Sequence, residues 1–82
     1  MRSQVFKALE NLKTVLEQAE LELADVVRLN YYTTDVDAFM SIANVLAQQL
    51  AEAGCVPSST LLGVQRLYHP DIMVELEATA VC

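Results

Sequence analysis

The chain has 82 residues, 54% of them hydrophobic, and a formal net charge of −6. A chain of this length forms one domain at most and buries only about 60–70% of the surface that its unfolded form exposes. Residues 1–82 are therefore expected to form a single domain whose excess apolar surface is covered by partner subunits. Only five Lys and Arg residues are present, and they are scattered, which argues against binding to nucleic acid.

The composition also bears on the compartment and on bound groups. No apolar run reaches the roughly 18 residues typical of a transmembrane helix, and no charged and then apolar leader opens the chain. Cys55 and Cys82 form neither a CxxC motif nor a metal-ligand spacing. Two reduced thiols, a cytoplasmic location, no membrane association, no metal and no cofactor are the expectations that follow.

The first predicted element is an amphipathic helix over Ser3–Ala19, with Ser3 as its N-cap. Its apolar stripe consists of Val5, Leu9, Leu12, Leu16 and Ala19. After a connector, the β-branched and aromatic residues of Val26–Thr33 predict a strand. Alternation would place Val27, Leu29 and Tyr31 on a face covered by helices, and Arg28, Asn30 and Tyr32 on the other face.

A second helix is predicted over Val36–Ala53, where apolar residues again recur at helical spacing. Thr34 and Asp37 resemble a capping box at its start. Gly54 is a natural terminator after its last turn, and Pro57 prevents any continuation.

The last 27 residues contain two predicted strands. Thr60–Leu67 is apolar enough to be buried on both faces. Ile72–Val81 alternates, with Val74, Leu76, Ala78 and Ala80 on one face and Met73, Glu75, Glu77 and Thr79 on the other. The segment Tyr68–Asp71 contains turn-forming residues, so the two strands are expected to form a hairpin.

The predicted order is α-β-α-β-β, an α+β domain. A strand, a helix and a strand in succession indicate a crossover with at least one parallel pairing. Each helix has one apolar stripe, so both are expected to cover the same face of the sheet. The opposite face is expected to be an interface.

Several short motifs occur in an order that resembles a known family. They are Gln4 through Asn11-Leu12, Ala24-Asp25-Val26-Val27, Asp35-Val36-Asp37-Ala38-Phe39, Pro57-Ser58-Ser59-Thr60 and Val74-Glu75-Leu76-Glu77-Ala78. Together they resemble the RidA/YjgF family of reactive-intermediate deaminases, also called the L-PSP endoribonuclease-like family. The resemblance implies a chorismate-mutase-like fold, a mixed sheet with two helices on one face. It also implies a homotrimer with ligand clefts between subunits.

The chain departs from the family pattern at several places. Members usually begin with a β-hairpin before the first helix, and this hairpin has no counterpart here. Glu20 stands where the family tends to have a glycine, which should destabilise the helix end. The family arginine that binds the substrate carboxylate corresponds to Ser59. A hydroxyl offers one neutral hydrogen bond in place of a bidentate, charge-assisted pair.

The resemblance implies that Glu75 positions the attacking water in the hydrolysis of 2-imino or enamino acids. It also places Ser58, Ser59, Thr60 and Leu61 at the substrate-binding position. The residues alone favour plainer interpretations. Glu75 would then be a solvated carboxylate on a half-exposed strand, and the hydroxyls after Pro57 would bond to the backbone at a strand entry. Glu77 would have a structural role and pair with Arg28 or Arg66, either across strands or across subunits.

The residues and the resemblance together lead to three alternative hypotheses about function. The first is a RidA-like protein that binds, and hydrolyses, a small imine- or carbonyl-containing metabolite. The second is a non-catalytic ligand-binding or regulatory trimer on the same scaffold, which the missing arginine favours. The third is an endoribonuclease or translation inhibitor, which the charge of −6 argues against.

Overall fold

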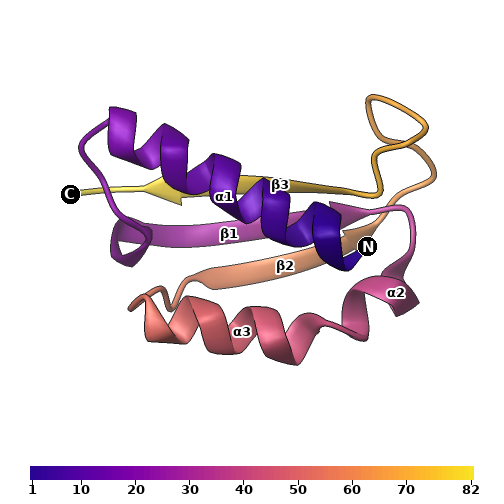
Figure 1. The fold of residues 1–82 in the computed structure, drawn as a ribbon, viewed down its shortest axis with the longest axis horizontal. Coiled ribbons are helices and arrows are strands. Elements are labelled where there is room, and N and C mark those ends of the chain that lie inside the picture. The colour runs from indigo at the N-terminus through magenta and orange to yellow at the C-terminus, as the bar shows by residue number, and fades with distance from the viewer.

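The central element of the computed structural model, which describes residues 1–82, is strand β1 (Val26–Thr33). It pairs in parallel with β2 (Ser58–Gly63) and antiparallel with β3 (Val74–Ala80), so the strand order is β2-β1-β3. Figure 1 shows the sheet with β1 in the middle. The predicted parallel crossover is confirmed, because β1 and β2 are joined through helices and run in the same direction.

The helices pack on one face of this sheet. They are α1 (Arg2–Gln18), the short 3-10 helix η1 (Leu23–Asp25), α2 (Val36–Met40) and α3 (Ala43–Glu52). Figure 1 shows α1 lying along β1 and β3, and α3 running beside β2. Buried side chains from the helices and from β1 form one apolar cluster, which includes Val5, Leu9, Leu29, Tyr31, Phe39, Leu46 and Leu50. The predicted α+β architecture is therefore confirmed.

The predicted hairpin between the last two strands is wrong, because β2 and β3 lie on opposite sides of β1 and do not pair. A tight hairpin needs a short loop, whereas residues 64–73 separate these strands. Both ends of that loop are bound to the end of β1. The Val64 N–H donates to the Thr33 carbonyl oxygen, and the Thr34 N–H donates to the Met73 carbonyl oxygen. The loop thus passes the end of β1 and reaches its free edge.

The second predicted helix is divided into α2 and α3. A turn at Ser41 and Ile42 separates them, and Ile42 has non-helical backbone angles. The Ser41 hydroxyl donates to the Ala38 carbonyl oxygen at 2.6 Å, which satisfies a group at the end of α2. The N-cap is Asp35 and not Thr34: its carboxylate accepts from the Ala38 N–H at 3.0 Å. Ser3 likewise lies inside α1, whose N-cap is Met1.

Two burial expectations are also wrong. A β-bulge between Val26 and Arg28 shifts the alternation, so Val27 is exposed. Strand β2 is an edge strand exposed along most of its length, not a strand buried on both faces. It ends at Gly63, where a Cβ atom would lie only 2.8 Å from Cγ2 of Val36. The alternation predicted for β3 is confirmed, since Val74 is buried and every second residue after it is more covered than its neighbours.

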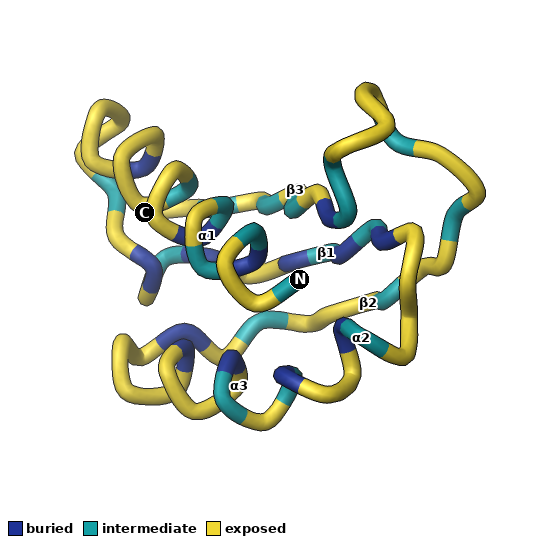
Figure 2. Tube along the Cα trace, turned by 45° about the vertical axis from the view of Figure 1, so that its right-hand side comes forward, coloured by how far each residue is buried: buried dark blue, intermediate teal, exposed yellow.

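Figure 2 shows how unevenly the chain is buried. Dark segments concentrate in β1 and on the sides of the helices that face it, while the loop before β3 is largely exposed. The second face of the sheet has no covering element. None of the helices has both the length and the apolar character needed to cross a membrane.

Helices α1 and α3 end in the same way but with different residues. After α1, the Glu20 N–H donates to the Glu17 carbonyl oxygen and the Leu21 N–H to that of Leu16, the pattern of a Schellman motif. Gly54 has the corresponding place after α3. The φ angles are +60° at Glu20 and +75° at Gly54. A left-handed conformation is unfavourable for any residue with a Cβ atom, so Glu20 is strained where Gly54 is not.

We expect Glu20→Gly to raise the free energy of unfolding by about 1 kcal/mol, since glycine adopts this conformation without steric penalty. Urea unfolding followed by circular dichroism measures the change. Glu20→Ala is the matched control, because it removes the charge and keeps the strain, and it should give little or no gain. Equal stabilisation by both variants would assign the effect to charge and not to backbone conformation.

Candidate functional site

Glu75 lies on β3 opposite Tyr32 of β1, on the face of the sheet that no helix covers. Its carboxylate accepts from the Tyr68 N–H at 3.4 Å, at the long end of the range for a hydrogen bond. Because β3 is an edge strand, Glu75 also lines a groove of about 860 Å³ between this strand and α1. The carboxylate is thus exposed and accessible to a ligand, as a water-positioning group must be.

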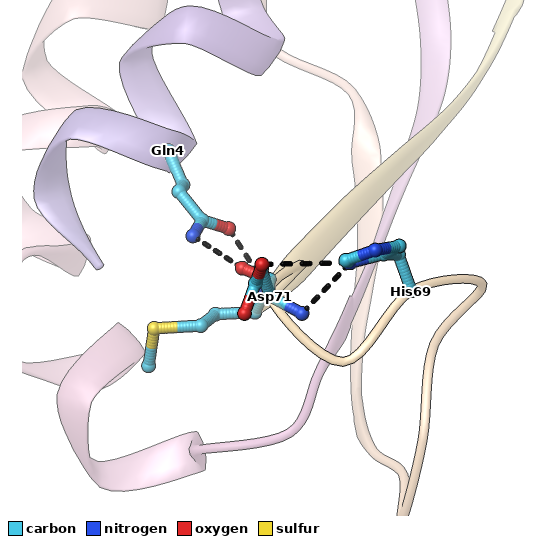
Figure 3. Close-up of polar contacts among 4 residues, drawn as sticks. Gln4, His69 and Asp71 are labelled. Carbon is cyan, nitrogen blue, oxygen red and sulfur yellow. Dashed lines mark hydrogen bonds and ion pairs between the residues drawn. The ribbon is translucent and has the colours of Figure 1, made fainter.

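The start of β3 is held in place by Gln4 of α1. Its Nε2 donates to the Asp71 carbonyl oxygen at 2.8 Å, and its Oε1 accepts from the Met73 N–H at 2.7 Å. Figure 3 shows this amide reaching the loop, where the His69 Nδ1 accepts from the Asp71 N–H at 3.1 Å. Gln4 therefore fixes the backbone two residues before Glu75. One feature of the sequence pointed to this residue, since Gln4 begins the first of the family motifs.

A hydrogen-bonded group on the open face was not predicted from the sequence. The Tyr32 hydroxyl donates to Glu77 Oε1 at 2.8 Å, and Asn30 Nδ2 donates to the same oxygen at 3.2 Å. The hydrogen bond from Tyr32 is the largest effect that lowers the pKa of Glu77, followed by that from Asn30. The same bond raises the pKa of Tyr32. Glu77 thus accepts from neutral donors, and within one chain neither Arg28 nor Arg66 forms a contact ion pair with it, although the charge of Arg28 also helps to lower the pKa of Glu77.

The four residues predicted after Pro57 do not form one cluster. They all lie on β2, where successive side chains point to opposite faces. The register pairs Ser58 with Arg28 and Thr60 with Asn30, so both belong to the open face. Ser59 pairs with Leu29 and Leu61 with Tyr31, so both belong to the face that the helices cover.

Ser59 lines a pocket of about 340 Å³ between α3 and the start of β2. Nine of its eleven lining residues are hydrophobic, and none carries a charge. Besides Ser59, two lining residues have a side-chain group that can form hydrogen bonds, Tyr31 and Cys55, and both are buried. Burial is the larger cause that raises the pKa of Tyr31 to about 12, followed by the nearby Cys55; burial also raises the pKa of the Cys55 thiol. Both groups are neutral hydrogen-bond donors near pH 7.

Ser59 and Glu75 are separated within one copy of the chain. They lie on the two outer strands of the sheet, with β1 between them, and on opposite faces. A site that uses both groups would need a second copy of the chain or further protein segments.

The sequence profile of the family described as endoribonuclease L-PSP matches residues 1–82. The chain belongs to this family, which is the RidA/YjgF family. A protein of Salmonella typhimurium named 2-iminobutanoate/2-iminopropanoate deaminase is 29% identical over 80 residues, which cover 96% of this chain and 62% of that protein. The chain spans 61 to 63% of the length of curated relatives that it matches.

Solved structures agree with the fold. A member of the YjgF/YER057c/UK114 family from Mycobacterium tuberculosis superposes with a TM-score of 0.80 and 35% identity, covering 92% of this chain and 62% of that one. Escherichia coli TdcF with bound serine superposes with a TM-score of 0.81 and 32% identity, covering 92% and 59%. The chorismate-mutase-like fold expected from the motifs is thereby confirmed.

We expect Tyr32→Phe to raise the pKa of Glu77 towards that of an ordinary glutamate, because the largest stabilising hydrogen bond to the carboxylate is lost. Asn30→Ala should raise it by less. The Glu77 pKa is lower in the folded chain, so its contribution to stability is present above the ordinary glutamate pKa and is lost as the pH falls through the lowered value.

Carboxyl-detected NMR titration of the wild-type chain and these variants measures the shift. Tyr68→Phe is the control, since Tyr68 is 95% exposed and only its backbone N–H contacts a carboxylate. An unchanged Glu77 titration in Tyr32→Phe would contradict the hydrogen-bond assignment.

Proposed function

We propose that this chain is a RidA-like small-molecule-binding protein that acts in the cytoplasm as a homotrimer. Its ligand is a small metabolite with an imine or carbonyl group, bound in a cleft between subunits. The pocket beside Ser59 on one subunit binds the ligand, and Glu75 of a neighbouring subunit orients water for hydrolysis. Two free thiols, Cys55 and Cys82, are compatible with a reducing compartment.

The observation that carries this proposal is the division of the two candidate groups between opposite edges and faces of one sheet. Symmetric association brings different surfaces of identical chains together, so a cleft between copies can combine what a single chain separates. Both outer strands are unpaired at their outer edges, and one sheet face is uncovered. These surfaces provide room for such contacts.

In imine hydrolysis the main chemical task of the protein is proton transfer. Water adds to the carbon of the C=N bond and gives a carbinolamine. Glu75, as general base, would take a proton from the water, and the protonated carboxyl would then give it to the nitrogen. The hydroxyl of the carbinolamine then gives its proton to the Glu75 carboxylate, which passes it to the nitrogen as the C–N bond breaks, so that ammonia leaves and a carbonyl compound remains.

A second candidate is a non-catalytic ligand-binding or regulatory trimer on the same scaffold. Ser59, which stands in the place of the family arginine, favours it, because a lone hydroxyl binds a carboxylate weakly. This candidate predicts thermal stabilisation by ligand without product. Endoribonuclease activity, the third candidate, has little support from a chain with a net charge of −6.

We expect Glu75→Gln to lower hydrolysis of 2-iminobutyrate, generated in situ by a threonine dehydratase, by about 100-fold or more, the typical effect of a lost general base. Ala47→Phe should also inactivate, because Ala47 is exposed on α3 and lines the Ser59 pocket, which the ring would fill. Folding and mass are checked for both variants by circular dichroism and light scattering.

Mixing these two variants after co-refolding tests the division of the site. In randomly mixed trimers about one quarter of the sites combine an intact pocket with an intact Glu75, so activity should return to about that level. No recovery from mixtures of the correct mass would contradict a shared site. Glu77→Gln serves as the control carboxylate substitution and should retain activity.

We expect Ser59→Arg to raise kcat/KM for 2-iminobutyrate by about tenfold or more, mainly through KM, since a guanidinium can bind the substrate carboxylate in a bidentate manner. Ser59→Lys is the matched control, with the same charge but without the planar fork, and should gain less. A protein of the correct mass that remains inactive even as Ser59→Arg would favour the binding-only candidate.

A further inference from the structure

Three lining residues of the Ser59 pocket have polar side-chain groups that form no hydrogen bond within the chain: Tyr31, Cys55 and Ser59. Of the two hydroxyl groups, only that of Tyr31 belongs to a buried residue. Tyr31 is only 7% exposed and lines the pocket. Its neighbour Tyr32 donates to Glu77, whereas no group of the chain forms a hydrogen bond with the Tyr31 hydroxyl. No fully buried side-chain polar atom in the chain lacks a partner. The Tyr31 hydroxyl therefore keeps some contact with solvent, and Tyr31 is one of the residues that line the pocket.

The pocket also lacks any group that could balance a negative charge. None of the five Lys and Arg residues lines it, and its lining is predominantly hydrophobic. Tyr31 and Cys55 are neutral near pH 7, because burial raises the pKa of both. Transferring a carboxylate into such surroundings without a paired cation is strongly unfavourable. A neutral acceptor that takes one hydrogen bond meets no such penalty.

We propose that this pocket selects an uncharged small ligand whose carbonyl or imine group accepts a hydrogen bond from Tyr31, with the apolar part of the ligand against Phe39 and Leu46. This rests on the proposed small-molecule function and names the ligand class of the same site. The volume of about 340 Å³ lies at the lower end of the range of small-molecule pockets. The ring of Tyr31 packs against Phe39, whose ring centroid lies 5.0 Å away, so the position of the hydroxyl oxygen is set before the ligand arrives.

Three six-membered-ring compounds of similar size test the proposal. Cyclohexanone has an acceptor, methylenecyclohexane has the same shape without one, and cyclohexanecarboxylate carries a charge. Binding to the wild-type chain is measured by NMR chemical-shift changes at amides of α3 and β2. We expect cyclohexanone to bind about three- to tenfold more tightly than methylenecyclohexane, the effect of one net hydrogen bond, and the carboxylate to bind most weakly.

Tyr31→Phe keeps the ring contact and removes only the hydroxyl, so it should abolish the preference for cyclohexanone over methylenecyclohexane and leave methylenecyclohexane binding unchanged. Tyr32→Phe, on the opposite face, should keep that preference. Ala47→Phe should abolish binding of all three compounds. Tighter binding of the carboxylate, or a preference for cyclohexanone that survives in Tyr31→Phe, would overturn the proposal.

These measurements need no turnover, so the two proposals can fail separately. Ketone binding through Tyr31 without hydrolysis of either 2-iminobutyrate or an uncharged imine of the same shape, such as the imine of cyclohexanone, would support this ligand class and reject the catalytic role of Glu75. Hydrolysis that depends on Glu75, together with tighter binding of the carboxylate, would reject this ligand class alone.

Discussion

The pairing of β1 on both sides is the constraint on which the rest of the structure depends. Strands β2 and β3 never contact each other through backbone hydrogen bonds, so each is held in the sheet only by β1. The end of β1 is also where the chain is tied together most closely. The fully buried Thr33 hydroxyl donates to the Met73 carbonyl oxygen at 2.8 Å and accepts from the Asp35 N–H at 3.1 Å. One side chain thus links the central strand to the start of β3 and to the start of α2.

The register set by β1 decides which face each candidate group occupies. Ser59 pairs with Leu29, and Glu75 pairs with Tyr32. Because Leu29 and Tyr32 lie on opposite faces of β1, the side chains of Ser59 and Glu75 lie on opposite faces of the sheet. A shift of one residue in either pairing would exchange the faces of that outer strand, but it would also turn its core-facing residues, such as Leu61 of β2 or Val74 of β3, away from the helices. The division of the candidate site between two faces is therefore a consequence of core packing. The Ser59 pocket and the Glu75 carboxylate do not depend on each other for their structure within one subunit.

The elements of the fold could be predicted from the sequence where burial of one face decides the pattern of apolar residues. The stripe of α1 and the alternation of β3 follow from burial on one side, so periodicity located both elements. The prediction of a hairpin was wrong because turn residues such as Pro70 and Asp71 indicate only that the chain changes direction. They do not indicate which strand the next segment pairs with. The break between α2 and α3 depends on backbone angles at Ile42 and on the Ser41 hydroxyl, and neither interrupts the helical spacing of apolar residues. Side-chain partners such as those of Gln4 and Glu77 depend on contacts 69 and 47 residues apart, which no local pattern encodes.

The pocket shows how ligand preference could change within this scaffold while the fold stays the same. Position 59 lies on an edge strand and its side chain is exposed, so its identity contributes little to the core. The lining around it comes from residues that the core requires in any case, Tyr31, Phe39 and Leu46 among them. With arginine at position 59, the strongest interaction available to a ligand would be a charge pair. With serine there, the apolar lining and the Tyr31 hydroxyl would be the largest remaining contributions, so under the proposed function a single surface position would set which chemical class the same cavity favours.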